Sequence, residues 1–192
     1  MLSAIQNRLA KLARCAPARC IAGFARRQEG AAAVEFGFVA LPFFALLFAI
    51  LETALVFFAG QSLEAAVSEA GRQVMTGQVQ NAGYSQADYK KNVVCTYLAS
   101  GVSMFDCANK VFVNVQTYTS FSSASSTAPP VTNGQLDSSK LKYDTGQPGD
   151  IVVVQLYYQW PIFVSLLGSN LANLGGDRLL VATSVFRNEP YK

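Results

Sequence analysis

The side chains that could carry chemistry are few in this sequence, and they are widely spread. The chain has 192 residues and no histidine, which excludes a Ser-His-Asp triad, a Cys-His dyad and any metal site with imidazole ligands. The acids of the second half occur singly, and no glycine-rich phosphate loop opens a helix. We therefore expect no catalytic residue, no metal site, no cofactor and no small-molecule substrate, and we expect that the protein is not an enzyme. What remains are two glutamates in a long apolar stretch and four cysteines.

The two glutamates, Glu35 and Glu52, enclose an uncharged stretch from Phe36 to Leu51, and apolar residues continue to Phe58. In water such a segment has to be wrapped by a large domain, whereas in a bilayer a helix alone satisfies its backbone. A helix over residues 31–60 is long enough to cover a hydrocarbon core of about 30 Å. We predict a transmembrane helix there, in contact with the lipid bilayer. Both glutamates then reach opposite interfaces, which is the simplest explanation of an acid in such a helix.

Basic residues are concentrated before the apolar stretch. Residues 1–30 carry six basic side chains against one acid, a net +5, and the rest carries nine against eleven, a net −2, which together give the formal +3. Because positive charge beside a membrane helix marks the cytoplasmic side, residues 1–30 are expected to be a cytoplasmic leader and the body to be periplasmic or extracellular. The folded body lacks a basic excess, so nucleic acid is not an expected partner. An ordinary signal peptide is disfavoured because the apolar run exceeds an h-region of about 7–15 residues.

The residues at the start of the helix resemble a known processing site. Gly30 follows the basic leader, small residues follow from Ala31, and Glu35 and Phe36 open the apolar helix. This pattern looks like a class IV prepilin processing site. Its continuation, GAAAVEFGFVALPFFALLFAILETALVFF, resembles the TadE-like minor pilins (pseudopilins) of tight-adherence (Tad/Flp, type IVc) pilus systems. Those sites often read Glu-Tyr where this chain has Glu35-Phe36, a departure that weakens the cleavage assignment and leaves the membrane helix unaffected.

The resemblance implies cleavage between Gly30 and Ala31 by a membrane prepilin peptidase. It also implies contact with other pilin or pseudopilin subunits and with the inner-membrane assembly platform. After cleavage Ala31 carries a new ammonium group, and Glu35 lies one helical turn later. Since an unpaired charge is costly in an apolar helix bundle, the resemblance implies that Glu35 of one subunit pairs with the N-terminal amine of its neighbour. The alternative is a hydrated Glu35 at the inner interface.

Two functions therefore stay open from the sequence. The first is a minor pilin or pseudopilin that is cleaved, extracted from the inner membrane and placed in or under an extracellular filament, where it supports pilus assembly, adhesion or secretion. The second is an uncleaved, membrane-anchored envelope assembly or binding protein. Only the first requires Gly30 together with Glu35, so those two residues separate the hypotheses.

The elements that follow predict a pilin-like α+β fold. Past Gly60 the apolar residues take a helical spacing over residues 61–80, so the membrane helix is expected to continue as an amphipathic helix to Met75, with Gly77 as its stop. Residues 81–192 predict a periplasmic domain of short helices and a small antiparallel sheet. One helix is expected from Ser85 to about Leu98, with Asp88 completing a capping box, ended by Gly101. The predicted strands are Val111–Gln116, Ile151–Trp160 and Leu179–Phe186.

Two connections in this domain are less regular. Residues 120–149 are rich in Ser, Thr, Pro, Gly and Asn, contain Asn133-Gly134 as a turn signal, and are expected to be a flexible surface loop, functional or partly disordered. The apolar segment Pro161–Gly176 is interpreted first as a core element that covers the sheet. The alternative is an apolar surface used against a neighbour or the bilayer.

Cys95 and Cys107 are expected to form a disulfide. They lie twelve residues apart in a domain assigned to an oxidising compartment. Closing a loop of that size stabilises a fold by about 2–3 kcal/mol. The alternative is two buried free thiols. Cys15 and Cys20 lie in the cytoplasmic leader and are assigned no role.

Overall fold

The computed structural model describes residues 30–100, 105–124, 128–162 and 172–191. It divides the chain into two units, Met1–Phe48 and Ala49–Lys192. The predicted leader with Cys15 and Cys20, the predicted stop at Gly101 and most of the predicted apolar segment after Pro161 lie outside the described residues. Within the described residues the chain has an α+β fold with a long N-terminal helix, a small antiparallel sheet and short helices, as the sequence predicts.

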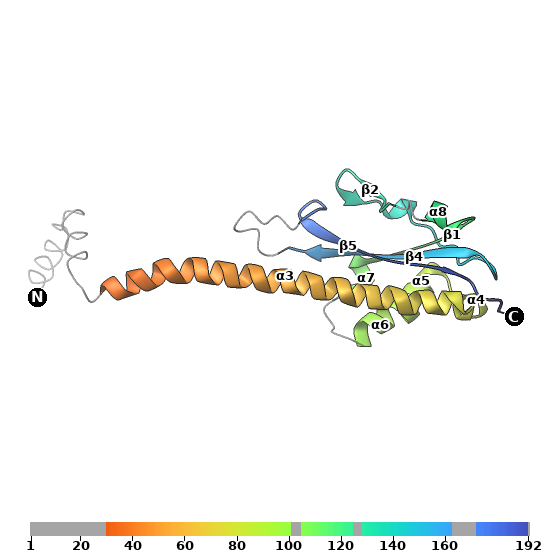
Figure 1. Ribbon diagram of the computed structural model, residues 1–192, viewed down its shortest axis with the longest axis horizontal. Helices are drawn as coiled ribbons and strands as arrows, with labels where there is room; N and C mark the ends of the chain where they lie inside the picture. The colour runs from red at the N-terminus through yellow and green to blue at the C-terminus, as the bar shows by residue number, and fades with distance from the viewer. Residues whose placement is uncertain (1–29, 101–104, 125–127, 163–171, 192) are drawn as a thin grey trace, which may run out of the picture. The chain divides into compact units, whose positions relative to one another are not determined.

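Helix α3 runs from Ala31 to Met75, the bounds expected from the sequence (Figure 1). In the first unit none of the described side chains from residue 32 to residue 48 is buried. Phe38 and Leu41, for example, are 76% and 75% exposed. A helix that is apolar on all sides and has nothing packed on it belongs in a membrane or in a bundle of helices. Its length and composition are sufficient for one membrane crossing.

The sheet belongs to the second unit and has three antiparallel strands in the order β1-β4-β5. These are β1 Val111–Tyr118, β4 Ile151–Pro161 and β5 Asp177–Arg187, so the three predicted strands are confirmed and each is one to three residues longer than expected. Leu156 in the central strand lies opposite Val113 on one side and Ala182 on the other.

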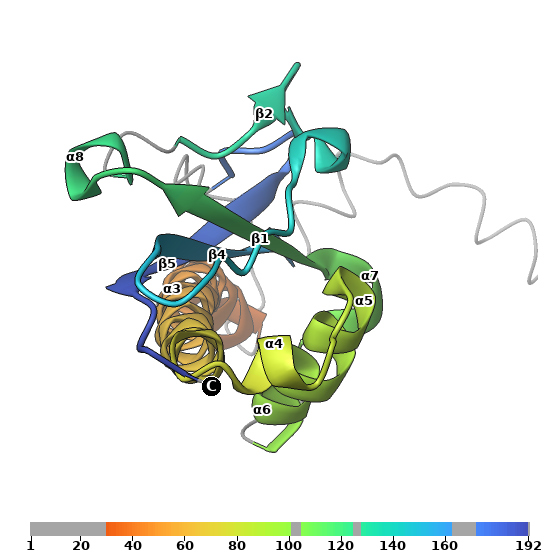
Figure 2. The same ribbon diagram turned by 90° about the vertical axis from the view of Figure 1, so that its right-hand side faces the viewer.

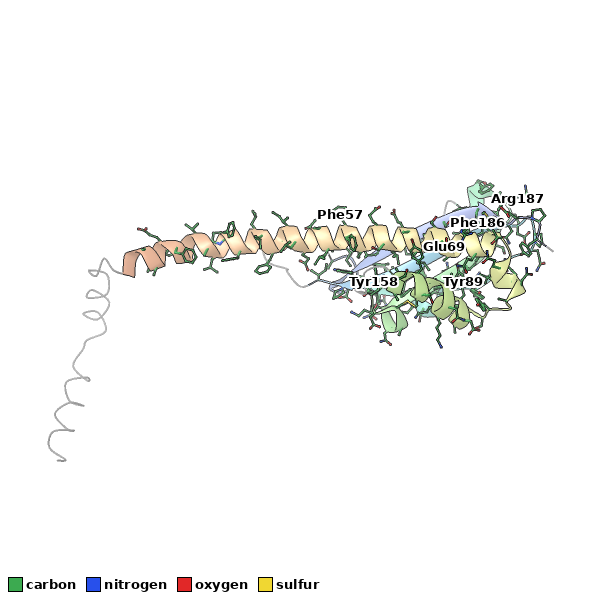
Figure 3. The ribbon with its side chains drawn as sticks, turned by 90° about the horizontal axis from the view of Figure 1, so that it is seen from below. Phe57, Glu69, Tyr89, Tyr158, Phe186 and Arg187 are labelled. Atoms are coloured by element: carbon green, nitrogen blue, oxygen red, sulfur yellow. A yellow bond between two sulfur atoms is a disulfide. The ribbon has the colours of Figure 1, made fainter. Side chains whose placement is uncertain are left out.

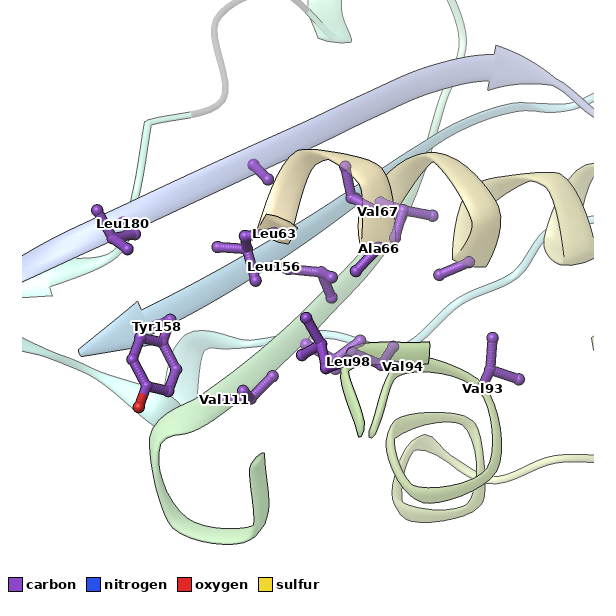
Figure 4. Packing of buried hydrophobic residues seen from close by; sticks show 14 of the residues in the cluster. Leu63, Ala66, Val67, Val93, Val94, Leu98, Val111, Leu156, Tyr158 and Leu180 are labelled. Carbon is purple, nitrogen blue, oxygen red and sulfur yellow. The ribbon is translucent and has the colours of Figure 1, made fainter. Parts of the chain in front are cut away.

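The second half of α3 packs on one face of this sheet. Figure 4 shows Leu63, Ala66 and Val67 of the helix facing Leu156 and Leu180 of the strands. The contact is close at Gly71, where an added Cβ would lie 2.9 Å from the Phe186 ring and 3.0 Å from the Ser184 hydroxyl. The predicted apolar face of the helix is therefore confirmed as the face that packs on the sheet: Leu63, Ala66, Val67, Ala70 and Val74 are all buried.

Short helices complete the same layer. They are α4 Gln78–Asn81, α5 Gln86–Tyr89, the π-helix η2 Lys90–Val94, α6 Cys95–Ser100 and α7 Cys107–Lys110. Figure 2 shows them beside α3, on one side of the sheet. The predicted capping box is present: the Asp88 N–H donates to the Ser85 hydroxyl, and the Ser85 N–H donates to the Asp88 carboxylate. The hydrogen bond from the Ser85 hydroxyl also lowers the pKa of Asp88.

The stretch 120–149 covers the other face of the sheet. Its described residues form α8 Phe121–Ala124, the hairpin β2 Val131–Thr132 and β3 Gln135–Leu136, and η3 Ser138–Lys140. The hairpin turns at Asn133 and Gly134, both at positive φ, which is the geometry that Asn-Gly favours. Leu136 and Leu141 pack against the buried Tyr157 of β4. The stretch therefore has local structure, and its flexibility stays a prediction.

Candidate processing and assembly site

The predicted cleavage bond lies at the N-terminal boundary of α3. Gly30 is half-exposed and occupies a helical turn directly before the helix, and Ala31 is the first α-helical residue. The first N–H groups of a helix have no intrahelical partner. The backbone around the Gly30–Ala31 peptide bond therefore unfolds locally more easily than the backbone in the helix interior. Glycine adds no side chain that would obstruct an approaching enzyme.

Glu35 and Phe36 lie on the first turns of the same helix and are exposed, Phe36 by 70%. Four residues of helix place Glu35 about 6 Å along the axis from Ala31 and on nearly the same side. Within the described part of the chain, the Glu35 carboxylate makes no hydrogen bond or ion pair. An added Cβ at the neighbouring Gly37 would touch nothing within 4 Å.

Glu52, which the sequence places near the outer bilayer interface, is only 6% exposed. It precedes Val56 by four residues and Ala59 by seven, and both are buried. Glu52 is thus buried on the same side of α3 as Val56 and Ala59. This 4-and-3 spacing was present in the sequence and could have placed Glu52 on the packed face.

Cys95 and Cys107 form the predicted disulfide, with 5.7 Å between their Cα atoms. The bond links the start of α6 to the start of α7, and α7 leads directly into β1. It therefore fixes the helical segment Gln86–Ser100 to the edge strand on which that segment packs.

The far end of α3 is closed by the C-terminal residues, which the sequence did not indicate. Gly77 has φ 77°, and an added Cβ there would collide with the Tyr191 ring. The Glu189 N–H donates to the Met75 carbonyl at 2.9 Å, and the Tyr191 hydroxyl donates to the Gly146 carbonyl at 3.2 Å. The predicted stop at Gly77 is confirmed. Glycine is needed there for two reasons: its positive φ, and the Tyr191 ring, which leaves no room for a side chain.

Residues 30–72 match the family described as TadE-like protein. The match begins at Gly30, includes Glu35 and Phe36, and confirms the resemblance over this stretch. It supports a minor pilin-type role associated with Tad pili and interaction with other pilus components. No curated protein and no solved structure gives a significant match to the chain.

Proposed function

We propose that this chain, whose residues 30–72 match the TadE-like family, acts as a minor pilin or pseudopilin of a tight-adherence pilus. A prepilin peptidase removes the basic leader at the cytoplasmic face. Residues 31–60 then anchor the mature chain in the inner membrane as a single pass, and the domain at the end of α3 lies in the periplasm. The assembly platform transfers the chain into or under a filament of other pilin subunits. The observation that carries this proposal is a helix that begins one residue after Gly30 and whose apolar side chains from residue 32 to residue 48 are not buried.

Cleavage is tested by replacing Gly30 with leucine. The bulky side chain is expected to block the peptidase, so the protein from native membranes retains residues 1–30, as measured by intact mass. Gly37→Leu is the matched control, because Gly37 lies on the same helix in open space and the variant should be processed normally. Wild-type protein that keeps its leader in a strain with a working pilus system would favour the uncleaved envelope protein instead.

Glu35 supports the assembly step. Its exposed carboxylate lies one turn from the amine that cleavage creates at Ala31, and in a bundle of apolar helices each of these charges needs a partner. We propose that Glu35 of one subunit pairs with Ala31 of the next and thereby sets the stagger of the helices, while Phe36 packs against the neighbouring helix. Because the pair forms only in one register, it contributes more to specificity than to stability.

Glu35→Gln keeps the shape of the side chain and removes its charge. We expect normal membrane insertion and cleavage but loss of incorporation into pili, measured on sheared filaments by immunoblot. Glu64→Gln is the control, since Glu64 is an exposed acid further along the same helix. Normal pili and adhesion in the Glu35 variant would show that this acid is only an interface marker.

A further inference from the structure

We propose that the base of the folded domain lies in the periplasmic interface of the bilayer that α3 crosses. The base consists of the exposed Leu55, Phe57 and Phe58 on α3 together with the half-buried Ile162, which directly follows β4. This inference depends on membrane insertion of α3, which is part of the proposed function, but not on cleavage after Gly30.

The sheet itself shows which part of α3 lies level with this end of the domain. Gly71 lies against Ser184 of β5. From Ser184 back to Asp177 the strand covers about 23 Å at roughly 3.3 Å per residue. The same distance corresponds to about 15 residues of helix. The first residue of β5 and Pro161, which pairs with it, therefore lie near the level of Val56.

At this level α3 has two different sides. One side is buried against the domain through Glu52, Val56 and Ala59. The other side exposes Leu55, Phe57 and Phe58 by 45%, 71% and 46%. Phe57 and the strand residue Tyr158 are both labelled in Figure 3. The first packed turns of the domain thus carry large apolar side chains on their outer surface, where water would be an unfavourable neighbour.

The length of the helix places this level at the edge of the hydrocarbon. If Glu35 marks the cytoplasmic boundary, a core of about 30 Å ends about 20 residues later, near Leu55. Glu52 then lies just inside the periplasmic edge, where ionisable side chains face protein and not lipid. Its exposed fraction of 6% meets that requirement.

The composition of the base also fits a membrane interface. Trp160 is the only tryptophan of the chain, and its ring lies 6.1 Å from the Tyr158 ring, which in turn lies 4.9 Å from the Phe105 ring. Trp160 and Tyr158 are 6% and 3% exposed, so these rings form the core behind the base, and the aromatic rings exposed at this level are those of Phe57 and Phe58. Asp177 and Arg178, half-exposed at the same end of the sheet, limit the depth to the headgroup region.

The test uses tryptophan fluorescence of the full-length protein in nanodiscs whose lipids carry bromine either near the headgroups or deep in the chains. Trp160→Phe gives a background without tryptophan, and among the described residues the indole N–H has no hydrogen-bond partner that the change would remove. Single tryptophans are then placed at Ile162 in the base, at Phe44 in the apolar half of α3, and at Phe121. Phe121 is 55% exposed and follows β1 at the opposite end of the sheet.

We expect shallow bromine to quench Ile162→Trp at least twofold more than Phe121→Trp, and deep bromine to quench Phe44→Trp. If Phe44→Trp is quenched and Ile162→Trp is not, the base does not touch lipid and the proposal is wrong, although membrane insertion holds. If neither is quenched, membrane insertion itself fails. Protection of Ile162→Trp from acrylamide only in oligomers, without any bromine quenching, would assign the base to a second subunit and would also overturn the proposal.

Discussion

Removal of the Cys95–Cys107 disulfide should destabilise the domain by a calculable amount. The two residues are separated by twelve positions. The loop-entropy relation gives about 3 kcal/mol at 25 °C for a closed loop of that size. Both side chains are only half-buried, so replacing them with alanine leaves little cavity to add to this figure. For a unit of this size 1 kcal/mol corresponds to about 3–5 °C, so Cys95→Ala/Cys107→Ala should lower Tm by roughly 10 °C.

The assay is thermal unfolding of the detergent-solubilised protein followed by circular dichroism, with and without reductant. If loop closure is the cause, reduced wild-type protein should unfold near the temperature of the double variant, and the variant should not respond to reductant. A double variant that unfolds within 2 °C of the oxidised wild type would refute the argument that this bond holds the helical segment against β1. Free thiols at both positions in protein isolated without reductant would refute its premise.

Two further outcomes follow from the fold. Gly77→Ala should lower the unfolding free energy, measured by chemical denaturation, more than Gly83→Ala does. Both glycines have positive φ, which costs alanine about 1–2 kcal/mol at each position, but only Gly77 lies under the Tyr191 ring. Equal losses in the two variants would contradict the ring contact. Burial raises the pKa of Tyr143 and of Tyr157 to about 12. Their contribution to the unfolding free energy should be fully present below pH 10 and should be lost as pH rises from about 10 to 12, because the phenols ionise in the unfolded chain and not in the folded one. If Tyr143→Phe leaves alkaline unfolding unchanged, Tyr143 does not contribute to this loss.

The local sequence predicted well those features in which a residue type strongly favours one local structure. Helix α3 ends where Gly77 takes a positive φ, and Ser85 with Asp88 forms the capping box. The alternating and branched residues of β1, β4 and β5 formed strands because few other structures accept such runs. The cysteine pair formed because both residues lie at the ends of short helices that the chain brings together.

What the sequence did not predict depends on contacts between distant segments. Leu136 and Leu141 have no periodicity of their own, yet they cover Tyr157 on the outer face of the sheet. The side-chain amides of Asn114 and Gln155 are buried and joined at 3.0 Å, and neither residue type signals burial. The same holds for the Tyr191 ring over Gly77, because a contact across more than a hundred positions leaves no local pattern.

Glu35 and Glu52 end the same apolar stretch; the sequence predicts a specific role only for Glu35, and the structure separates their surroundings. Glu52 is enclosed by its own chain, so its surroundings stay the same whether α3 is in lipid or in a filament. Glu35 and the exposed apolar side chains from Phe36 to Leu51 are enclosed by nothing in the described chain, and under the proposed function their surroundings change when the helix is extracted from the bilayer. Extraction then exchanges lipid for neighbouring helices along those residues, a transfer between two apolar media that is nearly neutral for the phenylalanines and leucines. For the charge at Glu35 the same transfer has a free-energy cost. We therefore expect the pairing of Glu35 with the Ala31 amine of the next subunit, and not the apolar surface, to set the position of each subunit along the filament.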